Sequence, residues 1–437
     1  MQTRFLAAAA TTALLVGAGP ALAATVTIAT VNNGDMIVMQ KLSSAFEEQH
    51  PDIKLEWVVL EENVLRQKVT TDIATQGGQF DVMTIGTYEV PIWAAQDWLE
   101  PMDNLPADYD VEDVLKPVRE GLSYEGTLYA LPFYGESSMM FYRKDLFEQA
   151  GIEVPEQPKW PEVKQWAEQL HDPSGGVYGI CLRGKPGWGE NMAFVTTLVN
   201  TFGGQWFNMD WQPQLDSEPW HEAVSFYVDL LKNYGPPGAS SNGFNENLAL
   251  FSTGKCAMWV DATVAAGLLF NPQQSQVADK LGFAQAPVGK HPKGANWLWS
   301  WALAVPTSSD AKDAAKTFVE WATSKDYVEL VGEKQGWVAA PPGTRKSTYD
   351  NPQYQKAAPF AGFVLKAIET ADPVNTTAEP KPYNGVQYAG IPEFQAIGAQ
   401  VGQMIAAALT GQMSVDQALS AAQRATARTM QQAGYPK

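Results

Sequence analysis

The sequence of 437 residues is poor in the side chains that most often build metal or redox centres, with 2 cysteines and 4 histidines. Two cysteines are too few for a disulfide-rich scaffold or for a four-cysteine zinc site. The four histidines never approach the spacing of metal ligands, and they stand at His50, His171, His221 and His291. We therefore expect no metal site.

Basic residues are also scarce, with 30 lysines and arginines against 48 aspartates and glutamates and a formal net charge of −18. Because binding to phosphates needs a surplus of basic side chains, we expect no nucleic-acid partner. Hydrophobic residues still make up 45% of the chain, which is typical of a globular protein. The length exceeds that of one compact core and favours two domains.

Long apolar runs are missing after the N-terminus, where no segment reaches the roughly 18 residues of a membrane span. The first 23 residues combine Arg4, an apolar stretch from Phe5 to Gly17 and a small-residue motif that ends at Ala23. This pattern is typical of a secretory signal, with an apolar N-terminal helix as the alternative. We expect cleavage after Ala23, no lipid anchor and a periplasmic location.

Signatures of catalysis are absent as well. The pair His221-Glu222 lacks the second histidine of a zinc protease motif. The segment 135–139 lacks the final glycine of a nucleophile elbow, and no glycine-rich phosphate loop with lysine follows residue 23. Acidic pairs are plentiful but unspecific, which leaves a secreted carbohydrate hydrolase as an alternative. We expect a protein that is not an enzyme and that has no cofactor.

The first part of the chain alternates strand and helix patterns. Strands are predicted at 25–30, 53–60 and 80–85, separated by helices that start near Ile37 and Glu62. This order predicts an open parallel sheet, in which ligands bind beyond the carboxyl ends of the strands. One apolar stripe marks the first helix and comprises Val38, Leu42, Ala45 and Phe46.

In the remainder of the chain, predicted strands and helices alternate less regularly. Further strands are predicted at 128–134, 139–142, 178–182, 257–260 and 299–305. Further helices are predicted at 160–170, 194–202, 220–232 and 245–251, after Ser309 and from Glu393 onward. Two α/β lobes, with the chain crossing between them more than once, explain both the length and the lack of a clean boundary.

Aromatic residues are abundant, with 15 tryptophans, 15 tyrosines and 18 phenylalanines. Trp297, Trp299 and Trp301 alternate, and period two places them on one face of a strand. They either pack in the core or offer flat faces to a ligand. The C–H face of a polyhydroxylated ligand can lie on such rings, whereas its hydroxyl groups need hydrogen-bonding partners once they are buried.

Seven local patterns, taken in order, resemble the extracellular solute-binding proteins that serve ABC importers, in the sugar-binding group. They are FEEQHPDIKL at 46–55, FDV at 80–82, LYALPF at 128–133, MFYRKDLF at 140–147, FGGQW at 202–206, FSTGKCAM at 251–258 and LAVP at 303–306. Within this family the chain is most similar to the binders of sorbitol and mannitol. That finer resemblance is carried by TIGTYEVP at 84–91, WVDAT at 259–263 and WLWSW at 297–301.

The resemblance implies a type II-like fold of two lobes, each with a mainly parallel sheet flanked by helices, and a ligand cleft at the hinge. The expected lobes are residues 24–132 with about 300–338, and 133–299 with about 339–437. It further implies a monomer that binds a sugar alcohol and delivers it to a membrane permease. Another sugar or an oligosaccharide is the alternative ligand.

The resemblance and the strand ends together suggest one set of ligand-binding residues. They are Asn33, Asp35, Arg66, Tyr88, Tyr134, Glu136, Arg183, Asp261, Trp297, Trp299 and Trp301. Trp301 corresponds to a tryptophan on which the family commonly stacks its ligand. Trp297 and Trp299 replace a more usual pair of glycines, which narrows the cleft and suits a small linear ligand.

Each of these residues also has a structural interpretation. Asp261 can cap a helix, Glu136 can be a solvated loop charge, and Arg183 can lie on the surface or neutralise Glu136 or Asp261. The others can form turns, cover a helix surface or pack as rings. Cys181 and Cys256 both fall in predicted strands of the second lobe, and the sequence leaves open whether they form a disulfide.

Overall fold

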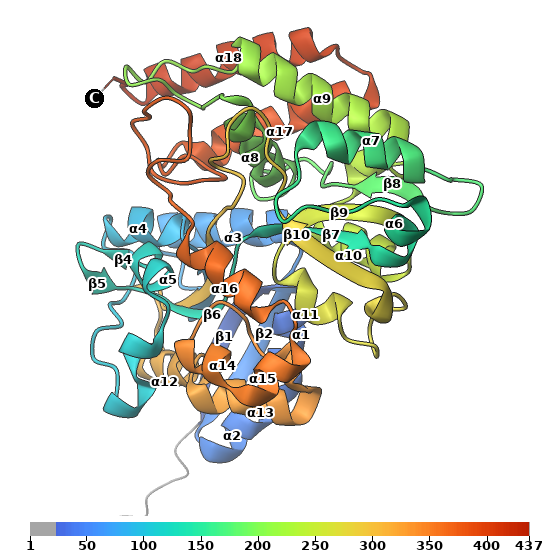
Figure 1. Ribbon diagram of the computed structural model, residues 1–437. Helices are drawn as coiled ribbons and strands as arrows, with labels where there is room; N and C mark the ends of the chain where they lie inside the picture. Colours follow the sequence, from blue (N-terminus) through green and yellow to red (C-terminus); the bar gives the residue numbers. More distant parts are fainter. Residues whose placement is uncertain (1–22, 437) are drawn as a thin grey trace, which may run out of the picture.

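The computed structural model describes residues 23–436, which are organised around two β-sheets (Figure 1). The predicted signal segment lies outside the described residues, apart from Ala23. Within the described part of the chain, no helix is both long enough and apolar enough to cross a membrane.

The first sheet combines four strands that precede residue 137 with one strand, β11, that the chain reaches much later. In spatial order its strands are β2 (Ile53–Leu60), β1 (Ala24–Val31), β3 (Val82–Gly86), β11 (Trp299–Ala304) and β6 (Leu131–Glu136). As predicted, β1 pairs in parallel with both β2 and β3, and its residues from Ile28 onward are buried. Burial of successive residues is typical of a strand covered on both faces.

The second sheet is built from one stretch of chain. Its strands, in spatial order, are β10 (Leu281–Gln285), β7 (Ser138–Arg143), β9 (Cys256–Ala262) and β8 (Tyr178–Cys181). A small hairpin of β4 (Ser123–Tyr124) and β5 (Thr127–Leu128) stands apart. A disulfide between Cys181 and Cys256 joins the parallel strands β8 and β9, with a Cα–Cα distance of 5.9 Å.

The pairing in both sheets is mixed, which refines the expectation of mainly parallel sheets. β11 runs antiparallel to β3 and β6, and β7 runs antiparallel to β9 and β10. The reason is topological, since β7 follows β6 after a single residue and β11 returns from the second sheet into the first. The two-lobe α/β architecture itself is confirmed by the solved structures described below.

Helices cover both sheets (Figure 1). Around the first sheet lie α1 (Gly34–Leu42), α2 (Ser44–Gln49), α3 (Glu62–Ala74), α4 (Glu89–Ala94), α5 (Lys116–Gly121), α12 (Lys312–Ala322), α13 (Lys325–Gln335), α14 (Lys346–Asp350), α15 (Pro352–Ala357) and α16 (Ala361–Glu369). Around the second lie α6 (Lys144–Ala150), α7 (Trp160–Leu170), α8 (Asn191–Phe202), α9 (Glu218–Tyr234), α10 (Phe244–Ser252), α11 (Ala265–Leu269), α17 (Phe394–Thr410) and α18 (Val415–Gln432). Short 3₁₀ turns occupy Ala107–Tyr109, Val111–Asp113, Ala239–Ser241, Ala278–Lys280 and Trp337–Ala339.

The last part of the chain is shared between the lobes. α16 packs on α5 and β6 beside the first sheet, whereas α17 packs on α8 and α18 packs on α9 (Figure 1). The chain therefore crosses between the lobes again after α16. The residue limits given above for the two lobes stay a prediction.

The segment predicted as one helix with a single apolar stripe forms two helices, α1 and α2, that meet at Ser43. The hydroxyl of Ser43 donates a hydrogen bond of 2.8 Å to the carbonyl of Gln40 at the end of α1. The fully buried side chains here are Met36, Met39 and Phe46. Of the predicted stripe, Phe46 alone is buried, because the break at Ser43 resets the helix face.

Candidate functional site

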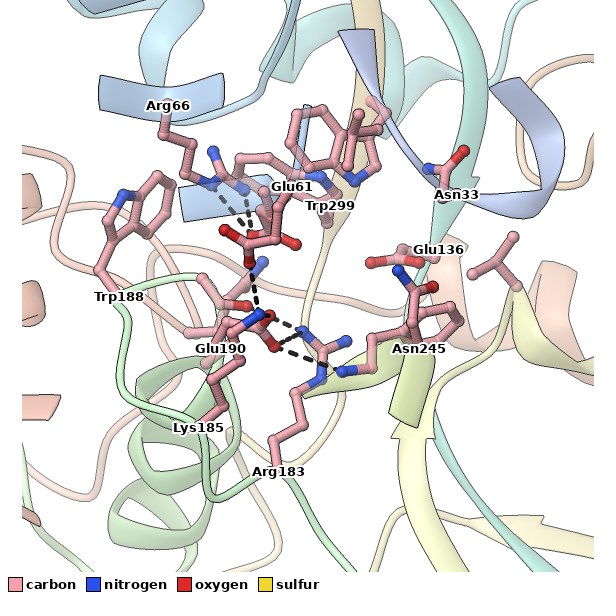
Figure 2. Close-up of a pocket in the computed structure, with 18 of the residues that line it drawn as sticks. Asn33, Glu61, Arg66, Glu136, Arg183, Lys185, Trp188, Glu190, Asn245 and Trp299 are labelled. Carbon is pink, nitrogen blue, oxygen red and sulfur yellow. Dashed lines mark hydrogen bonds and ion pairs between the residues drawn. The ribbon is translucent and has the colours of Figure 1, made fainter. Parts of the chain in front are cut away.

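A cavity lies between the two sheets (Figure 2). It is next to β11 and to the crossover, which is the point where the chain passes from β6 to β7. Together with its opening to solvent it encloses about 800 Å³. Both lobes and β11 contribute side chains. The predicted residues that line it are Asn33, Arg66, Tyr134, Glu136, Arg183, Trp297, Trp299 and Trp301.

Arg66 forms the first-lobe wall of this cavity. It projects from α3 and is 5% exposed, so its charge needs partners. Its guanidinium donates to Glu62 at 2.9 and 3.0 Å and to Glu89 at 2.6 Å. Glu89 also accepts from the backbone N–H of Gly86, and burial raises the pKa of its carboxyl. The hydrogen bonds fix the guanidinium in one orientation.

Three tryptophans surround the Arg66 guanidinium. Its central carbon lies 4.0, 5.0 and 4.5 Å from the ring centroids of Trp188, Trp299 and Trp301. Such contacts favour a cation over an aromatic face. Trp299 lies directly on the backbone of Gly86, where a Cβ would stand 2.1 Å from the ring. Only glycine at position 86 allows this ring position.

Arg183 forms the second-lobe wall. Its Nε and Nη2 donate to Asp261 at 2.6 to 3.0 Å, and its Nη1 donates to the carbonyl of Gly189 at 2.8 Å. Asp261 also accepts from the indole N–H of Trp259 and from the backbone N–H of Ala262. The carboxylate is therefore saturated, and its role is to hold Arg183.

The lobes contact each other at the rim of the cavity. Lys185 of the second lobe donates to Glu61 of the first at 2.5 Å. Nearby, Asn63 donates to the carbonyl of Pro186, at 3.2 Å. On the opposite side Asn245 donates to the carbonyl of Asn32, at 3.3 Å. The cavity is thus bounded by groups from both lobes, as Figure 2 shows.

Glu190 lies below this rim, close to Lys185 and Arg183. Its carboxylate is 3.6 Å from the ammonium group of Lys185 and 3.7 Å from the guanidinium of Arg183. The backbone N–H of Phe244 also donates to it. Burial raises the pKa of this carboxyl above its ordinary value, even with two cations beside it.

The crossover supplies Tyr134 and Glu136, both near the end of β6. The Tyr134 hydroxyl accepts from the side-chain amide of Asn33 at 3.0 Å, and Asn33 in turn caps α1 by accepting from the N–H of Met36. Burial raises the pKa of the Tyr134 hydroxyl well above 10.0. The Glu136 side chain is 6% exposed and projects toward the centre of the cavity in Figure 2.

Asp35, Tyr88 and Asp261 do not line the cavity. Asp35 borders a separate groove between α1 and α11, and burial raises the pKa of its carboxyl to about 7. Tyr88 packs behind Trp188 with ring centroids 4.7 Å apart. Its hydroxyl donates a hydrogen bond to the backbone carbonyl of Ile391, just before α17. Asp261 acts through Arg183. These residues are at the predicted strand ends, but they lie outside the lining of this cavity.

Several lining residues are absent from the predicted set. They are Glu61, Glu62, Lys185, Trp188, Glu190, Phe244, Asn245 and Gln387, among others. The signal for Glu61 and Glu62 was present, because they follow β2 at its carboxyl end as Asn33 follows β1. Trp188 and Glu190 sit in a loop, and Gln387 precedes α17. No periodic pattern marks those positions.

The cavity offers both donors and acceptors that the protein itself does not satisfy. Within residues 23–436, the indole N–H groups of Trp188 and Trp297 and the amide oxygen of Gln387 have no hydrogen-bond partner. Buried polar atoms ordinarily have one, so these atoms are available to a ligand. Across the described chain, no group of three or more metal-ligating side chains could hold a metal ion. The arrangement suits a neutral ligand with many hydroxyl groups.

Comparison with known proteins gives consistent results. Residues 33–329 match the model of the bacterial extracellular solute-binding protein family. A mannitol-binding protein of Pseudomonas aeruginosa is 62% identical over 415 residues, which cover 95% of each chain.

Two solved structures are similar over nearly the whole chain. A solute-binding protein of an ABC transporter from Agrobacterium vitis, with bound D-mannitol, is 60% identical with a TM-score of 0.94 and covers 95% of this chain and 100% of its own. One from Agrobacterium radiobacter, in complex with ribitol, is 26% identical with a TM-score of 0.82 and covers 94% and 100%. The chain belongs to the family of bacterial extracellular solute-binding proteins of ABC transporters.

Proposed function

We propose that this protein binds D-mannitol or a closely related sugar alcohol in the cavity between its lobes and delivers it to an ABC permease. The observation that carries the proposal is the cavity itself, which combines clustered tryptophans with unsatisfied polar atoms. The chain that forms it is 62% identical to a mannitol-binding protein. We further propose a periplasmic monomer that binds without catalysis.

Within this proposal, the rings of Trp297, Trp299 and Trp301 contact the C–H face of the polyol, and Glu136 and Arg183 hydrogen-bond its hydroxyl groups. Asn33 and Tyr134 line another side of the cavity, where they are hydrogen-bonded to each other. Arg66 contributes through the orientation of the tryptophans around it. Closing the lobes over the ligand removes water and strengthens these polar contacts.

Isothermal titration calorimetry with D-mannitol, D-sorbitol, ribitol and maltose tests the proposal directly. We expect binding of the hexitols, weaker binding of the shorter ribitol and none of the disaccharide. The absence of binding to any polyol or sugar would contradict the proposal. Release of product from a glycoside, lost on Glu136→Gln, would instead support the rival hydrolase.

Trp301→Ala tests the stacking role. Removal of the ring takes away apolar contact area and also leaves Arg66 with one face uncovered. We expect the affinity for D-mannitol to fall about 10- to 100-fold. Circular dichroism and thermal unfolding must show that the variant is folded. An unchanged affinity in a folded variant would remove Trp301 from the site.

A further inference from the structure

Glu136 differs from the other carboxylates around the cavity. It is 6% exposed and lines the space between the lobes. Throughout residues 23–436, its carboxylate has no hydrogen bond and no ion pair, although buried carboxylates normally have both. An unpartnered group at this depth, aimed into a cavity, points to a partner supplied by the ligand.

Five neighbouring carboxylates each lie beside a cation of the protein. Glu62 and Glu89 pair with Arg66, Asp261 and Glu190 pair with Arg183, and Glu61 pairs with Lys185. These three cations are therefore already in use, and in total the carboxylates outnumber them. When these groups are ionised, the cavity therefore carries an excess of negative charge, and Glu136 is the member of the set without a cation of its own.

We propose that the cavity also accepts a cationic amino sugar alcohol, whose ammonium group binds Glu136, and that it rejects the corresponding sugar acid. This inference rests on the proposed polyol site and adds a second ligand class to it. An ammonium group has three N–H donors and no lone pair, which matches a carboxylate without donors. It replaces one hydroxyl of the polyol without a change in the carbon chain.

The electrostatic surroundings of Glu136 support this ligand class. Burial raises the pKa of its carboxyl well above 4.5, Arg183 opposes that shift, and Asp261, Glu62 and Asp35 reinforce it. The ionised form of Glu136 is therefore poorly compensated by the protein, and the empty cavity favours its neutral carboxyl. A ligand ammonium group would compensate it directly, whereas a ligand carboxylate would add a further negative charge beside it.

The test compares ligands of one carbon skeleton. The probes are D-mannitol, its two amino analogues with the amine in place of the terminal or the adjacent hydroxyl, and D-mannonate. We expect at least one amino analogue to bind within about ten-fold of D-mannitol, and D-mannonate to bind at least about 100-fold more weakly. Calorimetry at one ionic strength measures all four.

Glu136→Gln separates charge from shape, because the side chain keeps its size and loses its negative charge. We expect this variant to lose about 10- to 100-fold more affinity for the amino analogue than for D-mannitol. The control is Glu153→Gln, an identical substitution at an exposed glutamate of the second lobe, which should leave both affinities unchanged.

The outcomes distinguish this inference from the proposed function. If D-mannitol binds but neither amino analogue does, the inference is wrong and the proposed function stands. Equal losses for both ligands on Glu136→Gln would also overturn the inference, since charge would then play no part. If no polyol binds at all, the proposed function fails first.

Discussion

At the scale of single residues, the buried charges form two self-contained groups. Arg66 is held by Glu62 and Glu89, and Arg183 is held by Asp261, with Glu190 beyond it. In each group the carboxylates fix the orientation of the cation, and Glu89 and Asp261 do so from outside the cavity lining. Polar residues behind the binding surface thus determine the geometry of the residues at that surface.

The pair of Arg183 and Asp261 is one place to test this. Asp261→Ala leaves a guanidinium that is 5% exposed without its main partner. Since breaking a buried ion pair leaves an uncompensated charge, we expect the free energy of unfolding to fall by about 3–5 kcal/mol. Urea unfolding measures this loss.

The double variant Arg183→Met with Asp261→Ala provides the control, because it removes both charges. It should recover part of the lost stability while binding of D-mannitol stays weak. A single variant as stable as the original protein would show that Asp261 does not support Arg183.

Asp35 predicts a pH dependence of stability. Burial raises the pKa of its carboxyl from 3.8 to about 7, so the folded state holds this proton more tightly than the unfolded state. The stability associated with the protonated form is present below pH 3.8 and is lost as the pH rises to about 7. The substitution Asp35→Asn removes the titrating group and therefore this loss of stability with rising pH.

The measurement is the difference in unfolding free energy between Asp35→Asn and the original protein. We expect the variant to gain relative stability between about pH 4 and about pH 7, with no further change above that. Other buried carboxyl groups titrate equally in both proteins and cancel in the difference. A difference that does not vary with pH would contradict the burial of Asp35.

At the scale of elements, alternation and helix periodicity were sufficient to find the strands of the two sheets except β10, and many of the helices. Predicted strands at 25–30 and 53–60 correspond to β1 and β2, and the predicted helix at 160–170 corresponds to α7. The position of β11 between β3 and β6 was not predictable from local patterns, because its partners lie far away in the sequence. Pairing at that range depends on the tertiary packing of the whole lobe.

The site was predictable to the extent that it follows strand ends. Asn33 was found in this way, whereas Glu136 and Trp301 were found through the family resemblance, and all three line the cavity. The direction of a side chain after a strand was not predictable, which explains why Tyr88 lies behind the cavity wall. The loop with Trp188 lacks periodicity, and its contribution depends on its approach to α3 across the cavity.

A substitution at Gly189 tests the contact between this loop and α3. A Cβ on Gly189 would stand 2.2 Å from a carboxylate oxygen of Glu62 and 3.0 Å from Arg66, on the opposite lobe. Gly189→Ala should therefore hinder closure of the lobes and weaken binding of D-mannitol about 5- to 100-fold, with little effect on stability. Calorimetry and thermal unfolding measure the two quantities.

Gly362→Ala is the matched control, since a Cβ at this exposed position of α16 meets no atom within 4 Å. It should leave the affinity unchanged. An affinity of Gly189→Ala equal to that of this control would show that the contact between the loop and α3 is not needed for binding.

At the scale of the whole molecule, the two sheets differ in how far apart their strands lie in the sequence. The second sheet uses strands from Ser138 to Gln285 without interruption. The first combines strands before Glu136 with β11, which the chain reaches at Trp299 after it has passed through the other lobe. Because β11 separates β3 from β6, the first sheet is incomplete without it.

The different spacing of the strands in the sequence predicts the order in which the two sheets form. The second sheet can form as soon as its contiguous strands are available, before the chain reaches α17 and α18 of the same lobe, whereas the first sheet, which contains β1, must wait for β11. Pulsed hydrogen exchange during refolding should show protection of β7 and β9 before β1 and β3. Simultaneous protection, or earlier protection of β1, would contradict this order. The N-terminal strands are thus the first to be synthesised, but their sheet is completed only when β11 has been made.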